Sequence, residues 1–315
     1  MGMSPVATAA SDYRVITEQC GVLDRSERGK LALAGADAKG FLQGQVTNDV
    51  EALTPGSGCY AAFLTPKGKM LGDLRVLDAG AELLLDTERI ALQALFNMIR
   101  RFSLGYDVAL HKRTLERGLL SLLGPRADDL VELPGAEHAH AVVEIGGIAA
   151  RAIRTDVGID LLCEAPATEP LLAALARSDV PPVSEAAAEC LRVERGRPRY
   201  GIDLDDTVIP QEAGLNERAV SFTKGCYVGQ ETVARLHYRG KPNRHLRGLR
   251  CAAPVEHGAE LRLGERSVGH VGSTADSPRH GPIALALVRR EAPPGSELSV
   301  GPDAVSAEVV ALPFV

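Results

Sequence analysis

Cys226 lies in the sequence KGCYVGQE at residues 224–231, between two glycines and two positions after Lys224. Residues 230–235 continue with a helical pattern. A nearby cation and the start of a helix both stabilise a thiolate, and the glycines let a partner approach closely. The pattern indicates an activated thiol or a soft ligand for a metal or cluster; the alternative is a small buried residue at a tight turn. Because an iron–sulfur cluster takes several ligands, this cysteine cannot hold one alone.

Glu194 is a second candidate. A helix predicted over 184–196, opened by a serine and followed by a glycine, places this glutamate in its last turn. A carboxylate there can accept two N–H bonds from a heterocycle such as a pterin. The alternative is a surface ion pair with one of the nearby arginines, which are Arg192, Arg195 and Arg197.

Asp73 is a third candidate. It stands where the glycine-rich turn 68–72 enters an apolar strand. In this place a carboxylate can act as a general base or bind a cationic group. The alternative is a turn carboxylate that accepts hydrogen bonds from backbone N–H groups.

A basic segment runs from 235 to 250 and contains no acidic residue. Its cations are Arg235, Arg239, Lys241, Arg244, Arg247 and Arg250. Such a segment can bind an anionic tail, a phosphate or RNA. Tyr238 is its one aromatic residue, so stacking of nucleic-acid bases is weakly supported, and a solvated basic face is the alternative.

The composition describes an ordinary globular chain. It has 315 residues, 45% of them hydrophobic, and a formal charge of −6, which argues against general coating of nucleic acid. The six cysteines show no CxxC spacing, so we expect no disulfide framework or zinc ribbon, no bound metal, and a reducing, cytoplasmic setting. No apolar run approaches the roughly 20 residues of a membrane span. Residues 1–11 are expected to form a loose tail rather than a signal peptide.

Changes of pattern along the chain predict four further segments. These are 12–113, 114–183, 184–245 and 246–315. In the first, strands are expected at 31–33, 60–64 and 74–77, and helices at 37–43 and 90–102, the latter capped by Asp86 or Thr87. In the second, the pattern favours strands at 119–123, 141–145, 149–153 and 158–163 and a helix at 168–177. The last has short apolar runs between glycines and prolines, which is typical of a small β-barrel or sandwich.

The KGCYVGQ sequence at 224–230 resembles the signature of the YgfZ family, which comprises folate-binding accessory proteins of iron–sulfur cluster maintenance. FLQGQVTNDV at 41–50 and AAFLTPKGKM at 61–70 are similar to other segments of that family. Segments shared with the wider aminomethyltransferase (glycine-cleavage T-protein) superfamily are LRVERG at 191–196, IPQEAGL at 209–215 and SVGHVGS at 267–273.

This resemblance implies an α+β fold, with mixed α/β units around a central folate site and a C-terminal all-β barrel. It also implies tetrahydrofolate, or a one-carbon derivative, as cofactor. Glu194 would hold the pterin and Asp73 would be catalytic, although Gly72-Asp73 replaces the paired aspartates of true aminomethyltransferases. Cys226 would act at the mouth of the site. The remaining implied folate contacts are Thr47, Asn48, Lys224, Tyr227, Gln230 and Arg235.

The resemblance gives three functional hypotheses. The leading one is a tetrahydrofolate-binding accessory protein that supports assembly or repair of iron–sulfur proteins, with those client or assembly proteins as partners. The second is a folate-dependent aminomethyltransferase or demethylase, against which Gly72 counts. The third is a tRNA-modification accessory protein, motivated by the basic segment 235–250.

Overall fold

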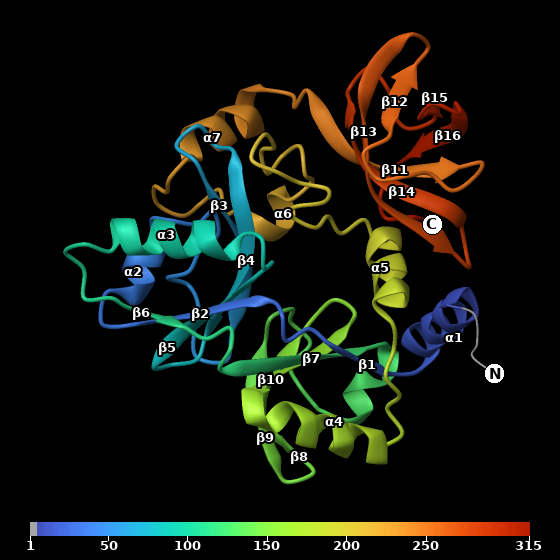
Figure 1. The fold of residues 1–315 in the computed structure, drawn as a ribbon. Coiled ribbons are helices and arrows are strands. Elements are labelled where there is room, and N and C mark those ends of the chain that lie inside the picture. Colours follow the sequence, from blue (N-terminus) through green and yellow to red (C-terminus); the bar gives the residue numbers. More distant parts are fainter. Residues whose placement is uncertain (1–4) are drawn as a thin grey trace.

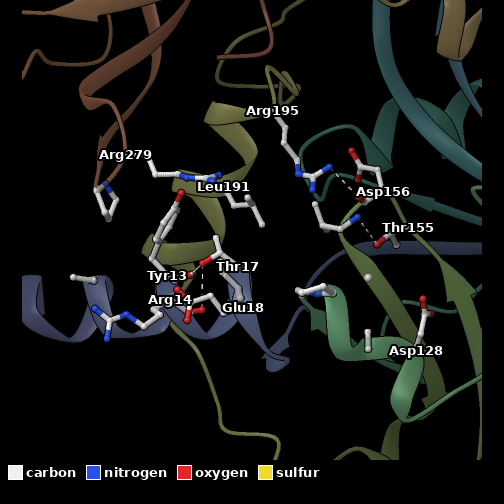
Figure 2. Close-up of a pocket in the computed structure, with 18 of the residues that line it drawn as sticks. Tyr13, Arg14, Thr17, Glu18, Asp128, Thr155, Asp156, Leu191, Arg195 and Arg279 are labelled. Carbon is white, nitrogen blue, oxygen red and sulfur yellow. Dashed lines mark hydrogen bonds between the residues drawn. The ribbon is translucent and has the colours of Figure 1, made fainter. Parts of the chain in front are cut away.

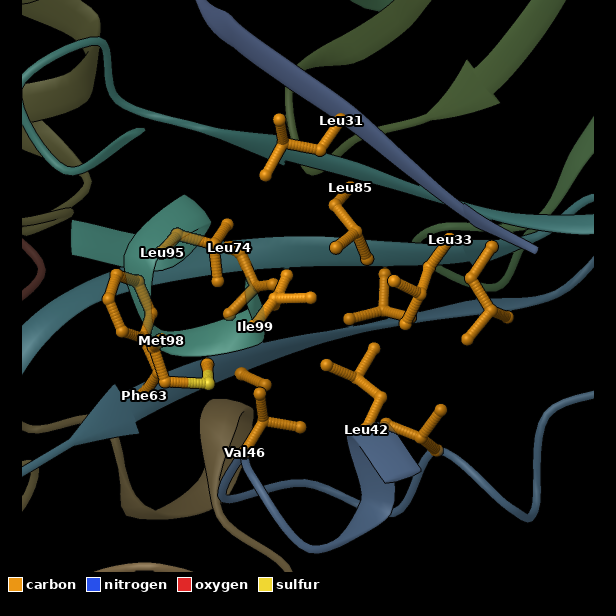
Figure 3. Close-up of a cluster of buried hydrophobic side chains, with 14 of the residues drawn as sticks. Leu31, Leu33, Leu42, Val46, Phe63, Leu74, Leu85, Leu95, Met98 and Ile99 are labelled. Carbon is orange, nitrogen blue, oxygen red and sulfur yellow. The ribbon is translucent and has the colours of Figure 1, made fainter. Parts of the chain in front are cut away.

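The apolar runs between residues 29 and 112 form an antiparallel sheet in the computed structural model, which describes residues 5–315, with side chains from residue 9 onward. In spatial order its strands are β3 (Gly58–Leu64), β4 (Met70–Asp78), β5 (Glu82–Thr87), β2 (Gly29–Ala34) and β6 (Ala109–Lys112). Two helices, α2 (Ala38–Gln43) and α3 (Leu92–Phe102), cover one face. Figure 3 shows the core between them, where Leu42, Phe63 and Ile99 are buried.

Helix α3 begins two residues later than the sequence pattern predicts. Its N-cap is Ala91, whose N–H donates to the carbonyl of Glu88 at 2.9 Å. Asp86 and Thr87 do not cap this helix, because both belong to β5. Ile90, expected inside the helix, lies before it with 66% of its surface exposed.

A second antiparallel sheet follows. In spatial order its strands are β1 (Gly21–Asp24), β7 (Arg117–Leu123), β10 (Gly158–Glu164), β9 (Ile148–Arg154) and β8 (His140–Ile145). Helix α4 (Thr168–Arg177) packs against it, with two short 3₁₀ segments, η1 (Pro125–Asp129) and η2 (Ala165–Ala167), at its margins. The edge strand β1 comes from before the first sheet in sequence, a long-range pairing that no local pattern announces.

The C-terminal segment closes into a barrel, as the sequence predicts. In order around the barrel the strands are β11 (Arg244–Cys251), β14 (Gly281–Arg289), β13 (Arg266–Ser277), β12 (Glu260–Leu263), β15 (Glu297–Val300) and β16 (Val305–Val310). Closure leaves no free edge between these strands, which suits short strands interrupted by glycine and proline.

Helices connect the three sheets. In Figure 1, α1 (Pro5–Glu18) lies beside α5 (Glu185–Glu194), between the second sheet and the barrel. The expected loose tail is therefore wrong for residues 5–11, because α1 docks Tyr13 and Ile16 into a buried cluster with α5. Residues 1–4 of that expected tail lie outside the described residues. Two further helices, α6 (Asn216–Ala219) and α7 (Gln230–Arg239), cover the first sheet near β3. Among the residues that the structure describes, no helix has the length and apolar character needed to cross a bilayer.

Candidate functional site

A cavity of about 220 Å³ lies where the two sheets meet helix α5. Strands β3 and β4 contribute Tyr60 and Asp73, the second sheet contributes Ser121 and Asp160, and α5 contributes Leu191. Residues from separate parts of the sequence thus converge on one polar space. Of the residues proposed from sequence, Asp73 is the one that lines it.

Asp73 is 6% exposed, and its carboxyl accepts a hydrogen bond from the Tyr60 hydroxyl. Burial, aided by the negative charge of Glu88, raises the pKa of Asp73 to about 6, against the opposing effects of the Tyr60 hydrogen bond and Arg28. The hydroxyl of Thr87 donates to the Asp73 carbonyl at 2.5 Å and fixes the backbone. A carboxyl that titrates near neutral pH can take up and release a proton during a reaction.

An ion-pair network forms the floor beneath Asp73. Asp86 accepts hydrogen bonds from Nε of Arg28 at 2.8 Å and from Nε of Arg75 at 2.7 Å. Arg75 also donates to Asp160 at 2.5 Å, and Ser121 donates to the same carboxylate at 2.6 Å. Burial alone would raise the pKa of Asp86, but the two guanidinium charges outweigh it and lower the pKa to about 2. Asp86 is therefore a fixed anion, whereas Asp73 is titratable.

The cavity wall is rich in charged side chains. Eight arginines line it, against five carboxylates. The arginines are Arg25, Arg28, Arg75, Arg192, Arg195, Arg197, Arg199 and Arg218. The carboxylates are Asp73, Glu88, Glu137, Asp156 and Asp160. Seven of these arginines form ion pairs, several of them with carboxylates just outside the lining such as Asp86, Glu189 and Asp203. Arg195 is the lining arginine that has no ion pair within the described residues.

His138 also lines the cavity and was not found by sequence reasoning. It is 7% exposed and has a φ of +69°, a left-handed backbone that is rare for residues other than glycine. Burial, together with the charges of Arg75 and Arg218, lowers the pKa of His138 to about 3, so the imidazole is neutral. Its Nδ1 atom is buried without a hydrogen-bond partner in the described part of the chain. A lone histidine in a loop gives no sequence signal of this placement.

Gly72 fills the position where a second aspartate is expected in true aminomethyltransferases. Its φ is +155°, and a Cβ atom there would lie 2.7 Å from Cβ of Ala91 and 2.7 Å from the ring of Phe63. Ala91 and Phe63 are buried, so neither can move aside easily. The fold therefore has no room for a side chain at position 72.

Gly72→Asp should lower the free energy of unfolding by at least about 3 kcal/mol, because it adds both a clash and a buried charge. Urea denaturation measures this cost. Gly135→Asp is the matched control, since nothing lies within 4 Å of its added Cβ, and it should change stability by less than about 0.5 kcal/mol. Equal stability of the two variants would contradict the steric argument.

Glu194 lies in the last turn of α5, as predicted, but the alternative of a surface ion pair is wrong because the residue is 5% exposed. Its oxygens accept hydrogen bonds from the Tyr13 hydroxyl at 2.8 and 2.9 Å and from the Ser277 hydroxyl at 2.5 Å. Cys190 Sγ lies 3.7 Å from Oε1. Glu194 thus joins α1, α5 and β13, and it is not among the residues lining the cavity at Asp73.

Thr47 and Asn48 are placed behind β3. The Thr47 hydroxyl donates to the Ala219 carbonyl at 2.5 Å and accepts from the Ala62 N–H at 2.8 Å. Asn48 Nδ2 donates to the carbonyls of Tyr60 at 2.8 Å and Arg218 at 3.3 Å. These side chains fasten backbone segments that carry cavity residues. They position the site rather than line it.

Lys224 is buried in a cage of carbonyl groups. Its ammonium donates to the carbonyls of Gln43 at 2.5 Å, Val46 at 2.8 Å and Asn48 at 2.8 Å, and lies 5.1 Å from the centre of the Tyr227 ring. Burial lowers the pKa of Lys224 to about 8, so the ammonium form still predominates at pH 7. The lysine therefore links the KGCYVGQE segment to the 41–50 segment.

Lys224→Met should cost about 2–4 kcal/mol of stability, because three carbonyls lose a charged donor. Hydrogen exchange should rise in 43–48 and 224–228 more than elsewhere. Lys241→Met, which alters an exposed lysine, is the control. Unchanged exchange in both segments of the Lys224 variant would show that the cage does not hold them.

Cys226 is exposed on the loop before α7, and the other cysteines are buried or half-buried free thiols. The N–H of Val228 donates to the carbonyl of Gly44 at 3.1 Å, and Gly229, at φ +84°, lies against the carbonyl of Thr65. Cys226 therefore sits at the junction of three signature segments, on the surface and outside the lining of the Asp73 cavity.

The residues that follow Cys226 point mostly to solvent or to internal partners. Arg235 and Arg239 are exposed on α7, which Gln230 begins. Arg244 pairs with Glu212 at 2.9 Å. The basic segment is thus divided between an exposed helix and the first barrel strand. None of its cations lines the Asp73 cavity.

Comparison with known proteins agrees with this architecture. The GCVT N-terminal domain profile matches residues 5–224, and the glycine cleavage T-protein C-terminal barrel domain profile matches residues 244–315. An aminomethyltransferase of Synechococcus sp. (strain CC9311) is 29% identical over 321 residues, covering 92% of this chain and 85% of that protein. A chloroplastic Arabidopsis thaliana protein that carries the name of a transferase is 28% identical over 313 residues, covering 93% and 71%.

A solved structure shares the fold across the whole chain. The glycine cleavage system aminomethyltransferase T from Bartonella henselae superposes with a TM-score of 0.86 at 24% identity, covering 98% of this chain and 89% of that one. The two sheets, the connecting helices and the barrel are therefore a known arrangement.

Proposed function

The chain belongs to the glycine cleavage T-protein family, and from that premise we propose that it binds a tetrahydrofolate in the cavity at Asp73. The observation that carries this proposal is Asp73 itself, a buried carboxyl with a pKa of about 6 in an arginine-rich wall. A reduced folate joins a bicyclic, proton-bearing ring system to an anionic tail. The carboxyl suits the ring and the arginines suit the tail.

Asp73 has the properties needed to handle a one-carbon unit on the folate. Its ionised form can accept a proton from a ring nitrogen, and its neutral form can return one. Tyr60 orients the carboxyl through its hydroxyl, and Arg218 lies 5.3 Å from the centre of the Tyr60 ring. These groups come from three different segments that the fold brings to one wall.

Calorimetry with tetrahydrofolate tests the binding step. The heat of tetrahydrofolate binding to the wild type should fit a single site. Arg218→Gln should weaken binding about tenfold because it removes a charged donor from the wall. Arg290→Gln removes an exposed charge outside this cavity and should leave the affinity unchanged. Absence of any tetrahydrofolate binding by the wild type would refute the proposal.

The role of Glu194 as the partner of the pterin remains a prediction from resemblance. A ligand that reached its carboxylate would have to replace the hydroxyls of Tyr13 and Ser277. Glu194→Gln should then weaken tetrahydrofolate binding more than Tyr13→Phe or Ser277→Ala, which loosen the same network but keep the carboxylate. Equal affinities in all three variants would exclude Glu194 from the site.

We further propose that the protein supports iron–sulfur proteins through Cys226. The KGCYVGQE motif and the exposed thiol support this role, since a surface thiol can meet a client protein. Complementation of a strain lacking its YgfZ-type protein tests it, with recovery of iron–sulfur enzyme activity as the measurement. The Cys226→Ser variant should fail to rescue, and full rescue by that variant would remove Cys226 from the mechanism.

An aminomethyltransferase is the second candidate, favoured by the name of the Synechococcus relative and by the titratable carboxyl of Asp73. In that reaction the bond between an aminomethyl carbon and its donor breaks, and the carbon passes to tetrahydrofolate. The products are methylene-tetrahydrofolate, ammonia and the donor, which carries a proton in place of the aminomethyl group. Incubation with a protein-bound aminomethyl donor distinguishes the two candidates. Stoichiometric ammonia and methylene-tetrahydrofolate would identify the enzyme, and their absence together with tetrahydrofolate binding would favour the accessory role.

A further inference from the structure

The segment 102–106, which ends α3 and leads into β6, carries an apolar surface that the proposed folate function does not use. Three of its residues are large, apolar and exposed: Phe102, Leu104 and Tyr106. Leu104 is 83% exposed, and nothing lies within 4 Å of a Cβ atom added at Gly105. In Figure 1 this segment projects from the molecule beyond α3 and β6. Exposed apolar side chains gathered in this way mark a surface that contacts a partner.

The backbone of the 102–106 segment is ordered by short-range hydrogen bonds. The N–H of Ser103 donates to the carbonyl of Ile99 at 3.0 Å, and the N–H of Tyr106 donates to the carbonyl of Ser103 at 3.1 Å. The Tyr106 ring packs against Phe41, with 5.3 Å between the ring centres. Because the segment is already ordered, little conformational entropy is lost when a partner covers it.

Unpaired cations stand on both sides of the 102–106 segment. Arg100 and Arg101 lie in the last turn of α3, and Lys112 ends β6. All three side chains are exposed, and none has an ion pair within the described part of the chain. The Arg101 guanidinium lies 5.4 Å from the centre of the Phe102 ring, so charge and apolar surface adjoin each other.

The positive charge is local to this part of the chain. Residues 89–113 contain five arginines and lysines and one acidic residue, although the whole chain has a formal charge of −6. One of the five, Arg113, pairs with Glu82. The carboxylates of Asp107 and Asp37 each accept a hydrogen bond from a backbone N–H, at 3.2 and 2.8 Å. A modest excess of unpaired positive charge therefore surrounds the apolar side chains.

The large cavities of the molecule lie elsewhere. One is the Asp73 cavity, and a neighbouring one of about 660 Å³ is bounded by α1, Leu191 and the turn between β13 and β14 (Figure 2). None of residues 100–112 lines either cavity. A partner at the 102–106 segment would thus leave both cavities open to small ligands.

The arrangement of the side chains favours a lipid surface over a folded protein. The apolar residues project from the molecule and are flanked by cations, rather than lining a groove that a protein segment could enter. At a bilayer surface, apolar side chains enter the boundary of the acyl chains while basic groups stay at the level of the phosphates. Anionic headgroups attract such basic groups, which adds to the apolar contribution.

We propose that the 102–106 segment attaches the protein peripherally to an anionic phospholipid bilayer. Phe102 and Leu104 enter the boundary between headgroups and acyl chains, and the lipid phosphates bind Arg100, Arg101 and Lys112. This contact is with the membrane surface and does not depend on folate binding.

Co-sedimentation of the full-length protein with vesicles tests the proposal. Phosphatidylcholine vesicles with about one third phosphatidylglycerol should bind the wild type at least about tenfold more tightly than phosphatidylcholine alone. Leu104→Ser should weaken binding to the anionic vesicles about tenfold, because it removes a leucine from the bilayer boundary. The double variant Arg100→Gln, Arg101→Gln should weaken it by a similar factor. Binding of the wild type should also weaken as salt rises.

Leu115→Ser is the matched control, since Leu115 is 89% exposed in the turn between β6 and β7, outside the 102–106 segment. It should leave vesicle binding unchanged. Neither serine variant should shift the midpoint of urea denaturation, so a loss of binding in Leu104→Ser cannot be a loss of folding.

Three outcomes would overturn the proposal. If the wild type does not bind the anionic vesicles, the segment is left as a surface for an acidic protein. If Leu104→Ser binds as tightly as the wild type, another surface meets the bilayer. If Leu104→Ser and Leu115→Ser lose binding equally, the attachment is not specific to the 102–106 segment.

Discussion

Asp73→Asn should strongly slow the proposed one-carbon reaction and at the same time make the protein more stable at neutral pH. The reaction should slow by about 10²–10⁴-fold, the usual contribution of a positioned acid or base. The stability should rise because asparagine keeps an acceptor for Tyr60 but carries no charge. Most substitutions destabilise a protein, so a gain in stability together with loss of the reaction is characteristic of a functional carboxyl.

The sign of the stability change follows from the direction of the pKa shift. The pKa of Asp73 in the folded protein is about 6, raised from an ordinary value of 3.8. Below pH 3.8 Asp73 is buried as the neutral acid at little cost in stability. The free energy of unfolding then falls as the pH rises through 6 and the buried carboxyl ionises. The ionised carboxylate costs up to about 3 kcal/mol at pH 8. The asparagine variant escapes this cost, so its advantage should appear between pH 4 and 7.

Urea denaturation at pH 4 and pH 8 measures this effect. The wild type should lose stability relative to Asp73→Asn between the two values, whereas Asp303→Asn, at an exposed barrel turn, should track the wild type. The reaction rate of the wild type should rise with pH through about 6 as Asp73 ionises. A variant less stable than the wild type at pH 8, or one that retains the reaction, would contradict the assignment.

Local patterns were sufficient to predict most elements of the fold. Helix α4 and four strands of the second sheet, β7, β8, β9 and β10, follow directly from apolar periodicity and from breaks at glycine and proline, whereas β1 does not. Helix α5 begins after Ser184 and ends before Gly196, which adopts a φ of +64°. These features depend on neighbours within a few residues, which is why sequence reveals them.

Contacts between distant segments were not predictable in this way. From sequence, Lys224 is expected to activate Cys226 or to bind folate. In the structure its ammonium instead donates hydrogen bonds to backbone carbonyls that lie 176 to 181 residues earlier in the sequence. Glu194 finds Tyr13 at a separation of 181 residues. Pairings of this kind depend on how whole sheets and helices pack, and the spacing of residues within one motif carries no information about them.

The candidate site, too, could be predicted from sequence only in part. Asp73 could be proposed because a carboxylate at the entry to an apolar strand is conspicuous in one segment. Tyr60, Arg28 and His138 could not, since each is an ordinary residue until the fold brings it to the cavity wall. Asp86 was misread as a helix cap because its nearest sequence neighbour with a clear pattern is α3.

Asp86→Asn should destabilise the protein by about 3–5 kcal/mol, the cost of leaving buried charges without a partner. Arg28 and Arg75 both donate to this carboxylate, and their side chains are 16% and 11% exposed. An asparagine keeps one acceptor but supplies no charge. Because Arg75 also anchors Asp160, the loss should spread across the floor of the cavity and weaken tetrahydrofolate binding as well.

The contribution of Asp86 to stability depends on pH with the opposite sign from that of Asp73. The pKa of Asp86 is lowered from 3.8 to about 2, so its stabilising effect is present above pH 3.8 and is lost as the pH falls through 2.

Urea denaturation at pH 7 should show the full loss in Asp86→Asn. Glu116→Gln removes one partner of an exposed pair with Arg113 and should cost less than about 1 kcal/mol. A double-mutant cycle with Arg75→Met should recover part of the loss, because the variant then no longer buries that unpaired cation. A loss of stability for Asp86→Asn as small as that for Glu116→Gln would mean that water reaches the two arginines. The floor of the cavity would then not be the rigid support on which the titration of Asp73 depends.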